Sequence, residues 1–405
     1  MIRPISLFLL IGIFAGNRES NATLQPSLFW LFLLLIIIPL VSLVLVQSLK
    51  KLKAMLLFAT VATLVSWLVA VYYFSWSTSV QTFTQDLSFL GDLFVVLPPI
   101  FWLLILWFVT SPIPNRISWV SHRLRLDILL LLIPVFILLT VNNVVVLYGV
   151  STDNVEIIEL VAFLLLLAIA PFFITRILSA KPMKNYELSS SISEIGQNAG
   201  IRQSKILVWN THNRIMNALA IGIIFQPKTI VLTDKLIENL TPQELRAVAA
   251  HEFGHHKYWH IPFLIITAVS VLIWSNKVFI YMWLDIGGGF VFILQLMLMV
   301  LGIIIVSRIF EKQADAYSAV AISKIAGSEC VTESGAISLA TALGAIAQTQ
   351  NIRLDRNDPL HGSISSRQQN LESLVGCDFS AIPINKKVFW IKIVICASFV
   401  LGILV

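Results

Sequence analysis

Charged side chains are scarce in this sequence of 405 residues. They make up 12% of the chain, whereas hydrophobic residues make up 57%. A soluble globular domain carries about 25% charged residues, so a water-soluble fold of this composition would lack the polar surface to cover itself. The mean hydropathy of +0.86 points the same way. Long apolar stretches must therefore face lipid, and we predict an integral membrane protein in contact with the bilayer.

Cysteine is also scarce, with three residues and no CxxC pair. This number and spacing exclude a disulfide framework and a zinc site built on cysteine. The net charge is +6, but the basic residues do not form one dense patch. They lie in short clusters between apolar runs. That distribution is typical of membrane topology, so we expect no nucleic-acid partner.

Apolar runs long enough to cross a bilayer, which needs about 20 residues, recur along the chain. We predict eight or nine spans, the ninth depending on the short run Ile5–Gly16, which could instead be a signal segment. The other eight are Leu28–Leu49, Ala54–Phe74, Phe89–Thr110, Ile128–Val150, Ile157–Leu178, Ile261–Trp283, Phe290–Ile309 and Val388–Val405.

Every second loop between these runs carries lysine or arginine, and positive loops stay in the cytoplasm. This places both long polar segments, Lys181–His260 and Glu311–Lys387, on the cytoplasmic side. We expect a multi-pass protein of a bacterial inner membrane. Its predicted parts are an N-terminal membrane region (1–180, five or six spans), two polar segments that form one domain (181–260 and 311–387), a hairpin of spans between them (261–310) and a last span (388–405).

The polar segments predict a small α+β domain inside a predominantly α-helical protein. Glu187–Gly200 has a helical pattern and Lys205–Trp209 that of a strand, while Ala218–Phe225 and Thr229–Leu232 predict a hairpin. A further helix should begin after Thr241, where Pro242 and Glu244 complete the pattern of a capping box.

This last helix carries the sequence His251-Glu252-Phe253-Gly254-His255. Residues four apart lie on one face of a helix, so both imidazoles can bind one metal ion. Glu252 is then placed to accept a proton from a water that the metal activates. HExxH with this division of roles is the pattern of zinc peptidases, and it predicts one Zn²⁺ per chain.

A catalytic zinc site needs a third protein ligand and one open position. Glu311 follows the Phe290–Ile309 run directly, and Asp315 comes four residues later. We predict Glu311 as the third ligand and Asp315 as the acceptor that orients a ligand histidine. His256 and His260 repeat the spacing on another helical face, so we expect them at the membrane interface and not around a second metal.

These motifs resemble those of the integral-membrane gluzincin metallopeptidases, the group of the HtpX heat-shock protease and the type I CAAX prenyl protease. The resemblance covers about half the chain, from roughly Glu187 to Leu371. It includes the approach to the zinc helix, the Glu-x-x-x-Asp pair, Asn217-Ala218-Leu219, and the segment from His361 to Arg367. Leu219 stands where the family has an aromatic residue, and Gly362 and Ser363 replace its prolines.

The resemblance implies a zincin-type domain in which Asn217, Ala218 and Leu219 open an edge strand that binds substrate backbone. It also implies that His361 and Arg367 lie near the metal and stabilise the oxyanion. We therefore predict a zinc metalloendopeptidase acting on protein or peptide substrates in or near the membrane. Two alternatives stay open: a membrane sensor that cleaves one cytoplasmic partner, and a transporter with a vestigial zinc fold. The sequence predicts no oligomeric state.

Overall fold

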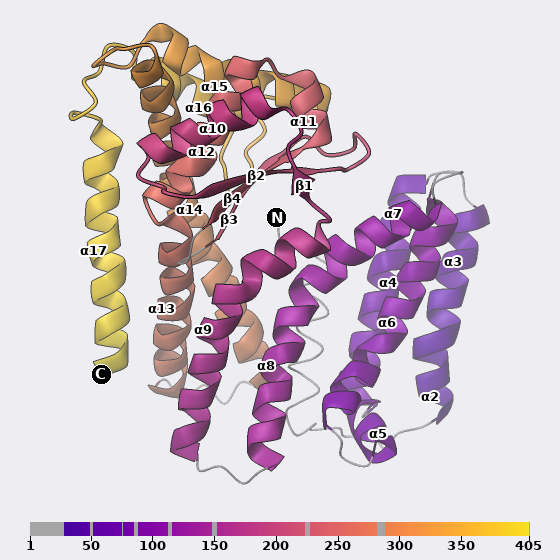
Figure 1. The fold of residues 1–405 in the computed structure, drawn as a ribbon. Helices are drawn as coiled ribbons and strands as arrows, with labels where there is room; N and C mark the ends of the chain where they lie inside the picture. The colour runs from indigo at the N-terminus through magenta and orange to yellow at the C-terminus, as the bar shows by residue number, and fades with distance from the viewer. Residues whose placement is uncertain are drawn as a thin grey trace. The chain divides into compact units, whose positions relative to one another are not determined.

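The computed structural model of the chain describes residues 28–48, 52–74, 76–84, 88–111, 116–147, 152–222, 227–281 and 288–404. The chain divides into two compact units, Met1–Leu166 and Leu167–Val405. Helices make up most of each unit, and one small mixed sheet belongs to the second (Figure 1). The predicted helical membrane protein with a small α+β part is confirmed at this level.

The first unit is built of helices among its described residues. They are α2 (Leu28–Phe32), η1 (Leu33–Ile37), α3 (Ile38–Ser48), α4 (Leu52–Tyr73), α5 (Trp76–Phe83), α6 (Ser88–Thr110), α7 (Arg116–Arg123), η2 (Leu124–Leu129), α8 (Leu130–Leu147) and the start of α9 (Thr152–Ile177). Proline 99 inside α6 has no N–H to offer the carbonyl four residues earlier, that of Val95. The indole N–H groups of Trp67 and Trp76 donate to this carbonyl instead, at 2.8 and 3.1 Å. Proline thus creates the acceptor that ties α4 and α5 to α6.

The second unit contains the sheet and the remaining helices. They are β1 (Lys181–Pro182), α10 (Tyr186–Asn198), β2 (Ser204–Trp209), β3 (Ala218–Ile221), β4 (Lys228–Thr233), α11 (Asp234–Asn239), α12 (Pro242–Lys257), α13 (His260–Tyr281), α14 (Gly288–Ile325), α15 (Glu333–Thr349), α16 (Ile364–Glu372) and α17 (Pro383–Leu404). The predicted helix, strand and hairpin are present as α10, β2 and the antiparallel pair β3–β4.

The sheet has the order β1-β2-β4-β3, with β2 parallel to β4 and the outer pairs antiparallel. Strand β3 is therefore an edge strand, as the family resemblance implied. Apolar side chains of α10, α12, β4 and α14 form the core over this sheet, and Ile192, Ile230 and Phe253 are completely buried in it.

Five helices among the described residues are long and apolar enough to cross a membrane. These are Phe29–Val46, Leu93–Thr110, His260–Phe279, Leu294–Ile325 and Pro383–Leu404. Met55–Val71 and Val161–Ile177 are apolar but shorter. The chain is a multi-pass membrane protein on this evidence, although the predicted count of eight or nine spans is not shown. The run Ile5–Gly16 lies outside the described residues.

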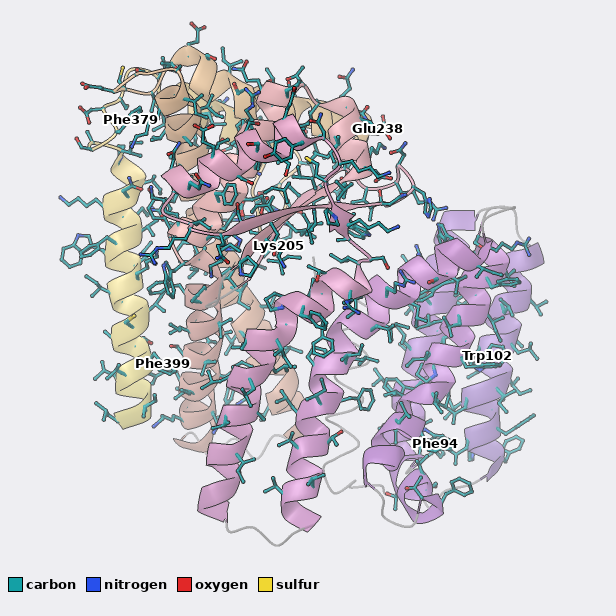
Figure 2. The ribbon with its side chains drawn as sticks, in the orientation of Figure 1. Phe94, Trp102, Lys205, Glu238, Phe379 and Phe399 are labelled. Atoms are coloured by element: carbon teal, nitrogen blue, oxygen red, sulfur yellow. The ribbon has the colours of Figure 1, made fainter. Side chains whose placement is uncertain are left out.

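Helix α14 is longer than predicted, because the expected span and the polar helix after it are one element of 38 residues. At about 1.5 Å per residue it extends about 57 Å, well beyond the ~30 Å hydrocarbon core. It packs against α13 and α17 through Val306 and Phe310. Figure 2 shows mainly carbon along α17, where Phe399 lies, and more nitrogen and oxygen around Lys205 and Glu238.

Candidate metal centre

Helix α12 begins as the sequence predicts. The Thr241 side chain accepts from the Glu244 N–H, and the Glu244 carboxylate accepts from the Thr241 N–H at 2.8 Å. Pro242 occupies the first turn, where its missing N–H costs nothing. The helix then runs unbroken to Lys257, so His251 and His255 lie one turn apart on the same face.

Gly254 allows α12 to approach α14 closely. A Cβ at this position would lie 3.1 Å from Ala314 Cα and 3.2 Å from Tyr317 Cδ1, so any side chain would push the helices apart. The Ser318 hydroxyl donates to the Ala247 carbonyl at 2.7 Å and sets the register of the two helices. This register turns Glu311 of α14 toward the two histidines.

The three predicted ligands meet at one point. His251 Nε2 and His255 Nε2 are 3.1 Å apart, and they lie 3.5 and 3.4 Å from the two carboxylate oxygens of Glu311. Ligands about 2.0–2.2 Å from a tetrahedral zinc ion are separated by roughly 3.4 Å. Glu311 Oε2 is buried and accepts no hydrogen bond from the described residues. The donor set and its spacing therefore fit Zn²⁺ with one position open.

The two ligand histidines differ in the direction of their pKa shifts. Burial lowers the pKa of His251, but contacts with Asp315 and Glu311 outweigh this effect and raise the pKa to about 10. Burial dominates at His255 and lowers its pKa to about 4. His251 Nδ1 lies 2.9 Å from Asp315 Oδ1, so Asp315 holds a proton on the nitrogen that faces away from the metal position. The orienting role predicted for Asp315 requires this contact.

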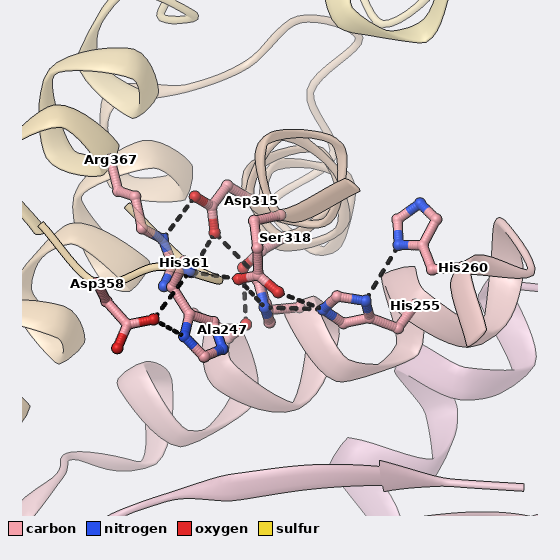
Figure 3. Close-up of polar contacts among 10 residues, drawn as sticks. Ala247, His255, His260, Asp315, Ser318, Asp358, His361 and Arg367 are labelled. Atoms are coloured by element: carbon pink, nitrogen blue, oxygen red, sulfur yellow. Dashed lines mark hydrogen bonds and ion pairs between the residues drawn. The ribbon is translucent and has the colours of Figure 1, made fainter. Parts of the chain in front are cut away.

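Arg367 of α16 lies on the side of Asp315 away from His255 (Figure 3). Its guanidinium donates to both carboxylate oxygens, at 2.9 and 2.6 Å, and one terminal nitrogen is 3.6 Å from Glu311. Both partners are buried. Arg367 is thus engaged in a two-point ion pair and acts on the site through Asp315.

Glu252 lies between the metal position and the edge strand. Its carboxylate accepts a hydrogen bond from the Ala220 N–H of β3, and loss of hydration raises its pKa. His361 lies close enough to influence the charge of Glu252. The His361 side chain is half exposed, and its Nδ1 is 2.9 Å from Asp358 Oδ1. The fold therefore brings Glu252 and His361 to the same side of the site.

The loop that carries His361 is fixed to α14. Arg308 donates to the Pro359 carbonyl at 2.8 Å and to the Asp358 carbonyl at 3.2 Å. Asp358 in turn accepts from the backbone N–H groups of Leu360 and His361. Neither Asp358 nor Arg308 was singled out from the sequence, since loop contacts leave no periodic pattern.

Asn217 leads into β3, which begins with Ala218 and Leu219 and lies beside α12. The Asn217 backbone exchanges hydrogen bonds with Thr233 Oγ1, and Gln350 donates to the Met216 carbonyl at 2.6 Å. The entry to the edge strand is therefore held from two sides.

The expectation for His256 and His260 is wrong. Both are buried within the protein, at 7% and 0% exposure, and neither faces a membrane interface. His256 packs toward the backbone of the sheet at Thr229 and Gly222. A bend after α12 turns His260 back onto His255, so helical spacing alone could not predict its place.

Comparison with known proteins finds a family match over part of the chain. Residues 182–352 match the family described as Peptidase family M48. CAAX prenyl protease 1 of Saccharomyces cerevisiae is 34% identical over 106 residues, which cover 25% of this chain and 23% of that protein. A Protease HtpX homolog of Thermoplasma volcanium is 29% identical over 193 residues, 44% of this chain and 58% of that protein. The chain thus matches these curated relatives over less than two thirds of their length.

A solved structure extends the likeness of the fold beyond this segment. The crystal structure of S. mikatae Ste24p superposes with a TM-score of 0.57 at 20% sequence identity, covering 91% of this chain and 97% of that one. At this identity the likeness concerns the fold alone.

Proposed function

We propose that the chain is a membrane zinc metalloendopeptidase of peptidase family M48, whose family model matches residues 182–352. Its substrates in this proposal are membrane or membrane-proximal proteins, cleaved at internal peptide bonds. The observation that carries the proposal is the triangle of ligand atoms from His251, His255 and Glu311, with sides of 3.1 to 3.5 Å, and Glu252 beside it.

Zinc, when bound, supplies the Lewis acidity that makes water nucleophilic near neutral pH. Glu252 takes the proton from the attacking water and passes it to the leaving amine. The Ala220 N–H holds the Glu252 carboxylate in place. The raised pKa of Glu252 suits a group that must both accept and release a proton.

His361 is the proposed donor to the oxyanion that forms at the scissile carbonyl. Its half-exposed ring is oriented by Asp358, and it lies near Glu252. Hydrogen-bond donors aimed at the developing charge are a large part of catalysis in acyl transfer. Arg367, paired with Asp315, adds a positive charge to the same site.

Substrate backbone is proposed to add to β3 at Asn217, Ala218 and Leu219. This strand is one of the two edge strands of the sheet and lies against α12. Strand addition binds an extended peptide through main-chain hydrogen bonds, with little demand on its sequence.

The proposed location is a bacterial inner membrane with the active site facing the cytoplasm and one zinc ion per chain. The alternation of basic loops supports this side. The two proposed peptidase segments, 181–260 and 311–387, flank the hairpin of α13 and α14, and this order along the chain supports a metal site near hydrocarbon. This position suits membrane-bound substrates.

A paired experiment tests the proposal. The wild type and Glu252→Gln are purified in detergent, their zinc content is measured, and cleavage of casein is followed. We expect one zinc per chain in both and proteolysis by the wild type alone. Zinc without any cleavage of casein would favour a selective sensor protease. Absence of zinc from both would contradict the proposal and favour the transporter alternative.

A further inference from the structure

A row of polar contacts leads from the metal site into the membrane helices. His255 Nδ1 lies 3.1 Å from His260 Nδ1, and His260 Nε2 lies 3.0 Å from Gln313 Oε1. Gln313 Nε2 then donates to Asn385 Oδ1 at 2.8 Å. The four side chains come from α12, α13, α14 and α17 in that order, so the row joins one metal ligand to three helices that are long and apolar enough to cross a membrane.

The middle of the row is buried, and the His260 ring is held in place. His260 is completely buried and Gln313 is 3% exposed, so water does not compete for their polar atoms. The His260 ring stacks on Phe310 with 4.4 Å between the ring centres and 7° between the planes. Figure 3 shows His260 facing His255 on the side away from Asp315.

The direction of every hydrogen bond in the row follows from its two ends. His255 points Nε2 toward His251 and Glu311, so Nδ1 must carry its proton whenever Nε2 binds a metal. His260 Nδ1 must then accept, which leaves the His260 proton on Nε2 to be donated to Gln313 Oε1. The Gln313 amide requires the same His260 tautomer. Its N–H group donates to Asn385, so its Oε1 faces His260 and accepts the proton on Nε2.

We propose that His260 is a positioning residue for the metal ligand His255, with Gln313 and Asn385 fixing its tautomer. This rests on the proposed use of His255 as a zinc ligand. The two ligand histidines are then oriented by different chemistry, His251 by the anionic Asp315 and His255 by a neutral imidazole. The last member of the row belongs to α17, so the C-terminal span contributes to the shape of the site.

The same contacts leave little room for a second metal at His260. Its Nε2 is occupied by Gln313, and its Nδ1 faces the nitrogen of His255 that bears a proton when zinc is bound. A metal between the two Nδ1 atoms would therefore compete with the zinc site instead of adding to it.

The test compares zinc affinity among variants of the full chain in detergent, by competition with a chromophoric chelator. His260→Phe keeps the ring and its stacking but removes both nitrogens. His260→Asn places an amide oxygen where Nδ1 was. His256→Phe is the matched control, a buried histidine beside His255 that faces the sheet. Titration with Co²⁺ reports the ligand geometry of each protein through its visible absorption.

We expect His260→Phe to bind zinc about 10–100-fold more weakly, with an altered Co²⁺ spectrum, while His260→Asn stays within about threefold of the wild type. His256→Phe should bind like the wild type. Gln313→Met tests the same proposal if His260→Phe fails to fold. It removes the acceptor of the His260 Nε2 proton, so His260 can carry its proton on Nδ1 instead.

Wild-type affinity in both His260→Phe and Gln313→Met would overturn the proposal, and so would equal losses in His260→Phe and His260→Asn. A different result would contradict the proposed peptidase function. A wild type that binds zinc but cleaves no casein or membrane protein, with the expected order of affinities intact, would contradict the function and leave the positioning role standing.

Discussion

Arg367 is the cation that faces the buried carboxylates of Asp315 and Glu311. Replacing it by methionine leaves the two carboxylates with the His251 imidazole as their cationic partner, and removing one member of a buried ion pair costs about 3–5 kcal/mol in soluble proteins. We therefore expect Arg367→Met to lower the thermal midpoint of the metal-free protein strongly. Arg367→Lys should recover only part of the loss, because an ammonium group cannot reproduce the two-point contact.

The control for this prediction is Arg353→Met. Arg353 pairs with Asp355 at 2.6 Å on the open surface, where ion pairs contribute little. Thermal unfolding should show no change for this variant. An Arg367→Met protein that melts like the wild type would mean that the buried pair is not formed in solution.

At the scale of residues, the sequence predicts the metal site well. The spacing of His251 and His255 depends only on local helical geometry, and Glu311 and Asp315 share one face of a second helix for the same reason. His260 could not be placed this way, because its contact with His255 depends on the turn between α12 and α13.

At the scale of elements, the contact between α12 and α14 depends on Gly254. We expect Gly254→Ala to push the helices apart, lower stability by about 1–3 kcal/mol and weaken zinc binding, since the ligands come from both helices. Melting and chelator competition measure both effects.

Gly344→Ala is the matched control in helix α15. Its new Cβ would meet only the end of the flexible Gln368 side chain, at 3.4 Å, so alanine should raise stability by up to about 1 kcal/mol. If both substitutions behaved alike, close packing at Gly254 would not be what holds the two helices together.

The loop before β3 is held by Asp234 at the start of α11. The Asp234 carboxylate accepts from the Thr211 hydroxyl at 2.6 Å and from the backbone N–H groups of Thr211 and Asn213. Partial burial raises the pKa of Asp234, but these hydrogen bonds outweigh it and hold the pKa below its usual value.

This shift predicts the pH dependence of stability. A carboxyl with a folded pKa below its unfolded value stabilises the fold above the unfolded pKa of about 3.9, and the contribution disappears as pH falls through the folded value. The difference in melting temperature between the wild type and Asp234→Asn should thus be largest near neutral pH and shrink below pH about 4. A difference that grows on acidification would contradict this account.

Helix α14 marks a limit of prediction at this scale. The sequence shows an apolar run that ends at Ile309 and a charged segment after it, which together suggest a span and a separate helix. Hydropathy indicates where a helix leaves the lipid, but it does not indicate whether the helix continues beyond that point. In the structure α14 continues to Ile325. The parallel pairing of β2 with β4 was also not predicted, because register across a sheet depends on distant contacts.

At the scale of the whole molecule, composition is sufficient to predict a multi-pass membrane protein. Five described helices meet the length and hydropathy of a span, while the predicted count of eight or nine stays a prediction. Some apolar runs contain a proline, as α8 and α9 do. For such runs, the length of the apolar run in the sequence does not fix the length of the helix that crosses the membrane.

The central claim is that one zinc ion binds His251, His255 and Glu311. X-ray absorption at the zinc edge of the purified wild type tests it most directly. The account predicts about 1.0 zinc per chain with two imidazole nitrogens at roughly 2.0–2.1 Å, oxygen at roughly 2.0–2.2 Å and no sulfur, and loss of this signal in Glu311→Ala. A sulfur shell near 2.3 Å, or an unchanged spectrum in Glu311→Ala, would contradict it.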